Sequence, residues 1–272
     1  MPAFADLLPM AVLLMVIGAF AGVIAGLLGV GGGIILVPAF FYAFAALGYG
    51  GPDLMQVCVA TSLATIIVTS IRSVVAHGKK AAVDWTILKG WAPGIVIGAA
   101  LGVLVVAGLR TTVLQAIFGT LALIVAFYLG FGRPDWRIGP AMPHGPVRAA
   151  LSPLVGFLSV LMGIGGGSFG VPLMSLYGVP IHRAVATAAG FGVLIAVPSV
   201  AGFLLTPVIG APPYTVGAVN LPAFLLIIAM TLLTAPLGVR LAHAMDPGPL
   251  RRVFGFFLAI VALNMLRKVA GW

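Results

Sequence analysis

Two glycine triplets interrupt long apolar runs of this sequence, and their spacing points to chemistry. The triplets are Gly31, Gly32 and Gly33, within GLLGVGGGIILVP, and Gly165, Gly166 and Gly167, within GIGGGSFGVP. A helix that resumes after each break would begin near Ile34 and near Ser168, where its first N–H groups have no intrahelical partner and its dipole is positive. Consecutive glycine N–H groups also form concave nests for anions. The pattern predicts a binding site for a small anion.

Close helix packing is the competing interpretation of glycines in apolar segments. The spacing of Gly18, Gly22 and Gly26, and of Gly94, Gly98 and Gly102, is typical of helix contact surfaces. The consecutive triplets do not have this spacing. Because irregular backbone at membrane depth must be covered by protein or line a polar cavity, the triplets predict a cavity near the middle of the membrane.

Hydroxyl side chains follow each triplet along the chain and could donate hydrogen bonds to a bound oxyanion. Thr61 and Ser62 stand in the string VATSLAT, and Thr187 stands in VATAAGF. The alternative is that these hydroxyls bond to a carbonyl oxygen one helical turn earlier. Both interpretations remain open at the level of sequence.

Arg72 and His77 stand near the basic loop that follows VATSLAT. We interpret them as a cytoplasmic mouth or gate, where Arg72 would collect anions and His77 would titrate near neutral pH. The alternative is that both lie at the membrane interface, with the arginine reaching toward water.

The residues that most kinds of catalysis and metal binding need are scarce. All five acidic residues are Asp, and they stand near expected helix ends or in loops, so no carboxylate is expected to relay protons at the bilayer centre. No nucleophile and base can be paired within the membrane, which argues against an enzyme. Cys58 is the single cysteine, and the four histidines lack ligand-like spacing. We therefore predict no metal site and no cofactor.

Membrane helices must position these residues. The chain has 272 residues, of which 62% are hydrophobic and 7% charged, and its mean hydropathy is +1.24, values that exclude an ordinary water-soluble domain. Several apolar runs reach the roughly 20 residues that a membrane-spanning helix needs. The net charge of +9 fits basic residues that flank such helices and meet anionic lipid, rather than nucleic acid. The sequence predicts an all-α polytopic membrane protein.

The chain uses one order of motifs twice. GVGGGIILVP and GIGGGSFGVP share six identities in ten, and residues 99–126 and 235–262 share ten identities. Each copy is expected to hold a glycine-broken apolar segment, a hairpin or two crossings, followed by three transmembrane helices. The expected segments are 9–47, 57–76, 86–109 and 112–131, then 148–178, 184–205, 220–244 and 250–268. The predicted domains are a first repeat (1–131), a linker (132–147) and a second repeat (148–272).

The distribution of charge favours opposite orientations for the two copies. If each broken segment returns to its own side or crosses twice, eleven of the 14 Lys and Arg residues face the cytoplasm, whereas a single crossing places nine there. The positive-inside rule thus favours inverted repeats, with both termini outside and a cytoplasmic linker. The eleven residues are Arg72, Lys79, Lys80, Lys89, Arg133, Arg137, Arg148, Arg183, Arg240, Arg251 and Arg252.

At these residues the sequence resembles the sulfite exporter TauE/SafE family of bacterial membrane proteins. The resemblance rests on the two glycine-rich strings, on VATSLAT and VATAAGF, and on Val83-Asp84-Trp85, and it covers nearly the whole chain. It implies a protein of two related halves that moves small sulfur-containing anions, such as sulfite, sulfoacetate or another organosulfonate, across the bacterial cytoplasmic membrane. The half-sites differ, because Ser168 is matched by Ile34 and Ser62 by Ala188.

The expected function is export of such an anion, by alternating access around a midplane site formed by the two breaks. A dianion that leaves a negative interior gains about 4 to 5 kcal/mol at 100 mV, so export needs no further coupling, whereas uptake does. An anion channel on the same inverted-repeat scaffold and a non-transporting subunit of a membrane complex are the alternatives. The expected partners are a small anion and membrane lipid, and a homodimer is left open.

Overall fold

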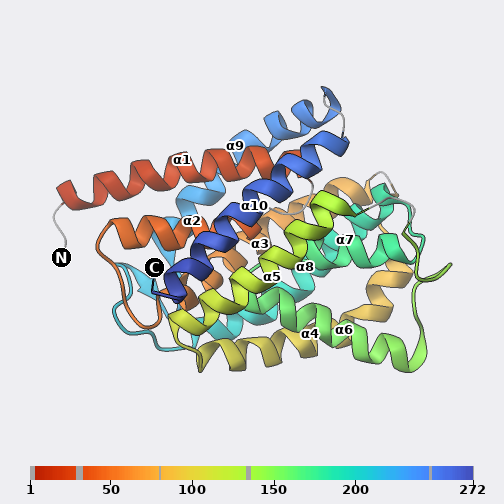
Figure 1. The fold of residues 1–272 in the computed structure, drawn as a ribbon, viewed down its shortest axis with the longest axis horizontal. Coiled ribbons are helices and arrows are strands. Elements are labelled where there is room, and N and C mark those ends of the chain that lie inside the picture. The colour runs from red at the N-terminus through yellow and green to blue at the C-terminus, as the bar shows by residue number, and fades with distance from the viewer. Residues whose placement is uncertain (1–3, 29–32, 80, 133–135, 245–246, 272) are drawn as a thin grey trace.

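The computed structural model describes residues 4–28, 33–79, 81–132, 136–244 and 247–271, which form a bundle of ten α-helices (Figure 1). The helices of the first half are α1 (Phe4–Leu28), α2 (Gly33–Ala46), α3 (Leu54–Gly78), α4 (Trp85–Ala107) and α5 (Thr111–Phe131). Those of the second half are α6 (Gly145–Leu161), α7 (Gly167–Leu176), α8 (Ile181–Leu204), α9 (Leu221–Ala244) and α10 (Pro247–Val269). A short antiparallel hairpin of β1 (Thr215–Val216) and β2 (Val219–Asn220) precedes α9.

The prediction of an all-helical membrane protein is confirmed. Five described helices are long and apolar enough to cross a membrane, and shorter apolar helices flank the breaks. In each half, a shorter helix, α2 or α7, is followed by three longer ones, α3 to α5 or α8 to α10. Helix α6 begins at Gly145, three residues before the expected start at 148. The five candidate spans are Leu54–Gly78, Trp85–Ala107, Thr111–Phe131, Ile181–Leu204 and Leu221–Gly238.

Glycines spaced four apart let helices of opposite halves pack closely, as the sequence predicts. An added Cβ at Gly18 or Gly22 would press on the α9 backbone, at 3.1 Å from the Cα of Ile227 and 2.8 Å from that of Thr231 respectively. Added Cβ atoms at Gly94, Gly98 and Gly102 would meet residues of α6. Helix α1 thus packs on α9, and α4 packs on α6.

Helices α3 and α8 pack against each other at the centre of the bundle, and α5 packs against α10. In the most apolar stretch of α3, 78% of the residues are buried, against 22% for α9. The two chain ends lie at the same end of the bundle (Figure 1). Every one of these four main contacts joins the first half of the chain to the second, so the two halves share one core.

Candidate functional site

The second glycine-rich break is a buried loop between α6 and α7. Helix α6 ends at Leu161, and Gly163 then adopts a φ of +62°, a conformation that favours glycine. The N–H of Ile164 donates to the carbonyl of Ser159 at 2.9 Å. All residues from 161 to 168 are buried, so this irregular backbone is covered by protein, as it must be at membrane depth.

The structure brings the start of α2 close to the second break. An added Cβ at Gly33, the first residue of α2, would lie 3.1 Å from the carbonyl oxygen of Gly163 and from the Cα of Ile164. The Ser62 hydroxyl donates to that same carbonyl oxygen at 2.7 Å. The predicted site residues Gly31 and Gly32 lie outside the described residues. The start of α2, the centre of α3 and the loop before α7 therefore meet in the middle of the protein.

Gly166, in the second triplet, sits where a side chain would not fit. An added Cβ at Gly166, the residue that caps α7, would lie 2.5 Å from the carbonyl oxygen of Ala188 and 2.9 Å from the backbone nitrogen of Gly192. One at Gly165 would lie 3.2 Å from Ile66. Gly166 thus allows α7 to start directly against α8, and Gly167 is buried as the first residue of α7. A polar cavity at the breaks stays a prediction.

Two buried hydroxyls beside this loop have no hydrogen-bond partner among the described residues. Ser168, in the first turn of α7, is 5% exposed, and Ser159, in the last turn of α6, is fully buried. A buried hydroxyl without a partner is unfavourable by roughly 1 to 3 kcal/mol. An oxyanion in contact with Ser168 would satisfy its hydroxyl and also meet the positive end of α7.

Thr61 and Thr187 make equivalent contacts across the two halves. The N–H of Asn220, just before α9, donates to the Thr61 hydroxyl at 3.0 Å, and the N–H of Asp84, just before α4, donates to the Thr187 hydroxyl at 2.9 Å. Both threonines are fully buried. Each oxygen therefore anchors the start of a helix in the opposite half, and each hydroxyl keeps a proton that it can donate.

Asp84 and Asn220 begin α4 and α9 in the same way, a role that sequence reasoning missed. The Asp84 carboxylate accepts from the N–H groups of Thr86 and Ile87, both at 3.1 Å, and the Asn220 side-chain oxygen accepts from Ala223 at 3.0 Å. Asp and Asn are favoured caps, so their matching positions in the repeat were an available signal. The unpartnered hydroxyl of Ser159 carries no such signal in the sequence.

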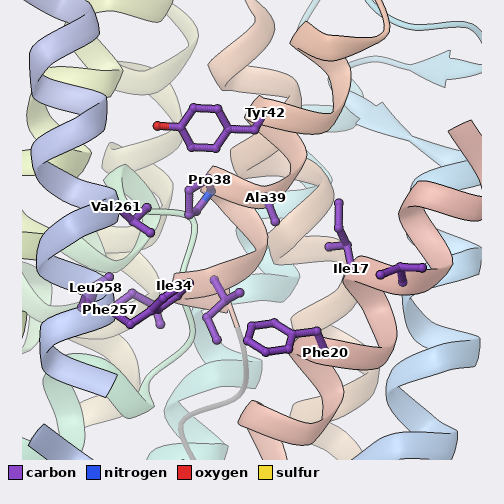
Figure 2. Close-up of a pocket in the computed structure, with 11 residues that line it drawn as sticks. Ile17, Phe20, Ile34, Pro38, Ala39, Tyr42, Phe257, Leu258 and Val261 are labelled. Atoms are coloured by element: carbon purple, nitrogen blue, oxygen red, sulfur yellow. The ribbon is translucent and has the colours of Figure 1, made fainter. Parts of the chain in front are cut away.

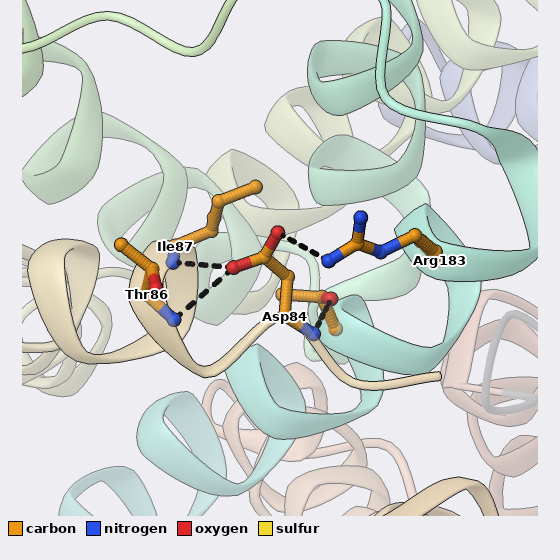
Figure 3. Close-up of polar contacts among 5 residues, drawn as sticks. Asp84, Thr86, Ile87 and Arg183 are labelled. Atoms are coloured by element: carbon orange, nitrogen blue, oxygen red, sulfur yellow. Dashed lines mark hydrogen bonds and ion pairs between the residues drawn. The ribbon is translucent and has the colours of Figure 1, made fainter. Parts of the chain in front are cut away.

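Arg72 and His77 stand apart from the buried cluster. Arg72 is exposed and His77 is half-buried, both in the last two turns of α3. Near this end, Arg183 at the start of α8 forms an ion pair of 2.9 Å with Asp84 (Figure 3). This pair joins the cap of α4 to the opposite half. The role of Arg72 and His77 as a mouth or gate stays a prediction.

Ile34 faces a different environment from the glycines before it. It is 3% exposed, and with residues of α1 and α10 it lines an apolar pocket of about 270 Å³ (Figure 2). Its counterpart Ser168 carries a hydroxyl at the matching position. The two helix starts therefore differ in polarity, as the sequence indicates.

The buried polar side chains of the described residues are all uncharged. They belong to Ser, Thr, Gln and Asn, so the interior offers hydrogen bonds without a fixed countercharge. Within the described ranges, no three His, Cys, Asp or Glu side chains gather into a possible metal site. This chemistry can hold an anion through N–H and O–H donors.

Comparison with known proteins gives consistent matches over most of the chain. The family described as sulfite exporter TauE/SafE matches residues 14–265. A probable membrane transporter protein of Haemophilus influenzae is 30% identical over 262 residues, which cover 94% of this chain and 98% of the relative. A probable membrane transporter protein of Methanocaldococcus jannaschii is 28% identical over 258 residues, which cover 93% and 94%. No solved structure matches the chain.

These matches confirm the resemblance drawn from the glycine-rich strings, and they confirm transport rather than catalysis as the general role. They extend through both breaks and all the helices that pack around them. The chain therefore belongs to the sulfite exporter TauE/SafE family and is a multi-pass membrane transporter.

Proposed function

We propose that this protein exports a small sulfur-containing oxyanion, sulfite or an organosulfonate such as sulfoacetate, from the bacterial cytoplasm. The description of its family supports the substrate class. The observation that carries the proposal is the contact of Gly33 with Gly163 and Ile164, which brings the start of α2 close to the loop that leads into α7. Two helix N-termini near one point make a favourable place for an anion.

The proposed binding residues surround this contact. The Ser168 hydroxyl and the first N–H groups of α2 and α7 would donate to the oxyanion. Ser62 would hold the Gly163 carbonyl in place, whereas Thr61 and Thr187, whose oxygens accept backbone N–H groups, would keep a hydroxyl proton for the substrate. The full proposed set is Gly31, Gly32, Gly33, Ile34, Thr61, Ser62, Gly165, Gly166, Gly167, Ser168 and Thr187.

The proposed mechanism is alternating access between two inverted repeats, residues 1–131 and 148–272, joined by a cytoplasmic linker. The reciprocal contacts of α1 with α9 and of α6 with α4 support this symmetry, as does the common position of the two chain ends. In such folds, one repeat moves against the other around a fixed central site. Arg72 and His77 would then lie at the cytoplasmic mouth.

Membrane potential would drive the export. The buried polar side chains of the described residues include no carboxylate, so proton coupling through the core is not needed in this scheme. A dianion that leaves a negative interior gains about 4 to 5 kcal/mol at 100 mV. Sulfite efflux from proteoliposomes should therefore accelerate when the outside is made positive, and voltage-independent efflux would contradict this direction.

A matched pair of serine variants tests the site. Ser168→Ala removes the unpartnered hydroxyl, and a hydrogen bond to a charged group contributes about 1.5 to 3 kcal/mol, so the KM for sulfite should rise about tenfold or more. Ser152→Ala is the control, because the Ser152 hydroxyl donates to the Arg148 carbonyl within α6 at 2.8 Å. Equal KM values for the two variants would remove Ser168 from the site. Conductance steps in single-channel recordings would instead identify a channel.

A further inference from the structure

The pocket beside Ile34 is lined by side chains other than the hydroxyls of the central cluster. Its lining comes from three helices: Ile17 and Phe20 of α1, Ile34 and Pro38 of α2, and Phe257 and Val261 of α10 (Figure 2). These side chains are apolar. The volume of about 270 Å³ is slightly below the range of pockets that hold drug-sized molecules, about 300 to 1,000 Å³, and suits a narrow chain.

The rim of the pocket is apolar and exposed. Val16 is 62% exposed and Phe20 is 52% exposed on α1, and Phe257 is 38% exposed on α10. In a multi-pass membrane protein, such side chains face lipid hydrocarbon. The pocket therefore opens toward acyl chains rather than toward water.

A polar group and two cations stand at one end of the pocket. Tyr42 lies at this end (Figure 2), and its hydroxyl accepts a hydrogen bond from the Asn264 side-chain nitrogen at 2.8 Å. The Lys268 ammonium lies 4.7 Å from the centre of the Tyr42 ring and 5.4 Å from that of Phe41. Arg267 adjoins Lys268 in the last turn of α10, and both side chains are exposed.

The spacing along α10 joins the apolar and cationic parts into one column. Phe257, Val261, Asn264 and Lys268 follow the spacing of residues that share one helix face. From Phe257 to Lys268 the helix rises about 16 Å. An apolar slot with a cation at one end has the polarity of a phospholipid, with hydrocarbon at one end and phosphate at the other.

We propose that this column binds an anionic phospholipid, with one acyl chain in the pocket and the phosphate at Lys268 and Arg267. The cation–π contacts hold the ammonium above the end of the pocket. Stabilisation of the α10 C-terminus by these cations accounts for their position in the last turn, but it does not account for the apolar slot that leads to them. A second copy of the chain would need a protruding side chain to fill the slot, whereas lipid surrounds it already.

Native mass spectrometry of the detergent-purified protein tests this assignment. Phosphatidylglycerol and phosphatidylcholine with the same acyl chains are added separately, and the fraction of protein that retains one lipid is measured. We expect phosphatidylglycerol to be retained preferentially. Lys268→Gln should weaken its retention about fivefold, which corresponds to the roughly 1 kcal/mol of a basic residue near an anionic lipid surface, and should weaken the retention of zwitterionic phosphatidylcholine less.

A second test of the proposal fills the pocket with a larger side chain. Ala39→Trp places a large side chain in the slot and should reduce retention of both lipids, whereas Leu104→Trp on the exposed face of α4, where Leu104 is 71% exposed, should not. Unchanged melting temperatures would show that the variants fold. Equal retention of the two lipids in every variant would overturn the proposal. A change from dimer to monomer in Ala39→Trp, without loss of lipid, would assign the slot to a second copy and also overturn it.

Discussion

Replacing Gly166 by alanine should disturb transport through one well-defined contact. The added Cβ would lie 2.5 Å from the Ala188 carbonyl oxygen and 2.9 Å from the Gly192 backbone nitrogen, and it would also press on Phe191. The first two are backbone atoms of α8 and cannot rotate away. Helix α7 must therefore move outward from α8, and Ser168 must move with it.

The expected magnitude follows from overpacking at a buried position. Inserting a methyl group into a filled core typically destabilises a protein by about 1 to 3 kcal/mol. A displacement of about 1 Å at a binding or reaction site can reduce its rate about a hundredfold. We expect Gly166→Ala to lower the melting temperature and to reduce sulfite efflux at least tenfold.

Efflux from proteoliposomes, normalised to the amount of folded protein, measures this effect. Gly130→Ala is the matched control, because an added Cβ at Gly130 in α5 meets no atom within 4 Å. That variant should retain wild-type efflux and melting temperature. If Gly166→Ala behaves like Gly130→Ala in both measurements, the close contact between α7 and α8 does not govern transport.

Three further substitutions have effects that can be ranked in advance. Ser62→Ala removes the buried hydrogen bond of 2.7 Å to Gly163 and should lower the melting temperature, by loss of about 1 to 3 kcal/mol; a wild-type thermal unfolding curve would contradict this. Thr187→Val leaves the Asp84 N–H without its acceptor, with a comparable loss expected and the same measurement. Arg183→Gln should cost less than about 1 kcal/mol, because Arg183 is 53% exposed in its ion pair with Asp84; a larger fall in melting temperature would indicate a more important pair.

The helices and their breaks could be predicted because membrane insertion imposes simple rules. About 20 apolar residues are needed to cross the hydrocarbon, and Gly triplets stand out against that background. The resumed helices begin at Gly33 and Gly167, each one residue before the expected position. The β1–β2 hairpin was not expected, because two short strands of two residues leave almost no pattern in the sequence.

The contacts of the candidate site could be predicted only in part. The sequence indicated Thr61 and Thr187 as possible donors, yet their oxygens act as acceptors. The Thr61 oxygen accepts from Asn220, 159 residues later in the chain, and the Thr187 oxygen accepts from Asp84, 103 residues earlier. Such pairings depend on how the helices pack. Likewise, a triplet in the sequence does not reveal that Phe191 lies against Gly166, so close packing and a cavity could not be separated.

The reciprocal threonine contacts also set an order on biosynthesis. Asp84 precedes Thr187 by 103 residues, so at a synthesis rate of about 5 to 20 residues per second the ribosome reaches Thr187 roughly 5 to 20 s after Asp84. During that interval, the Asp84 N–H at the start of α4 must find another hydrogen-bond acceptor, in water, in lipid headgroups or in the insertion machinery. The α9 start has no such delay, because Thr61 is already in the membrane when Asn220 emerges. The start of α4 in the first half is therefore anchored only after α8 of the second half has been made, whereas the start of α9 can be anchored as soon as it is made.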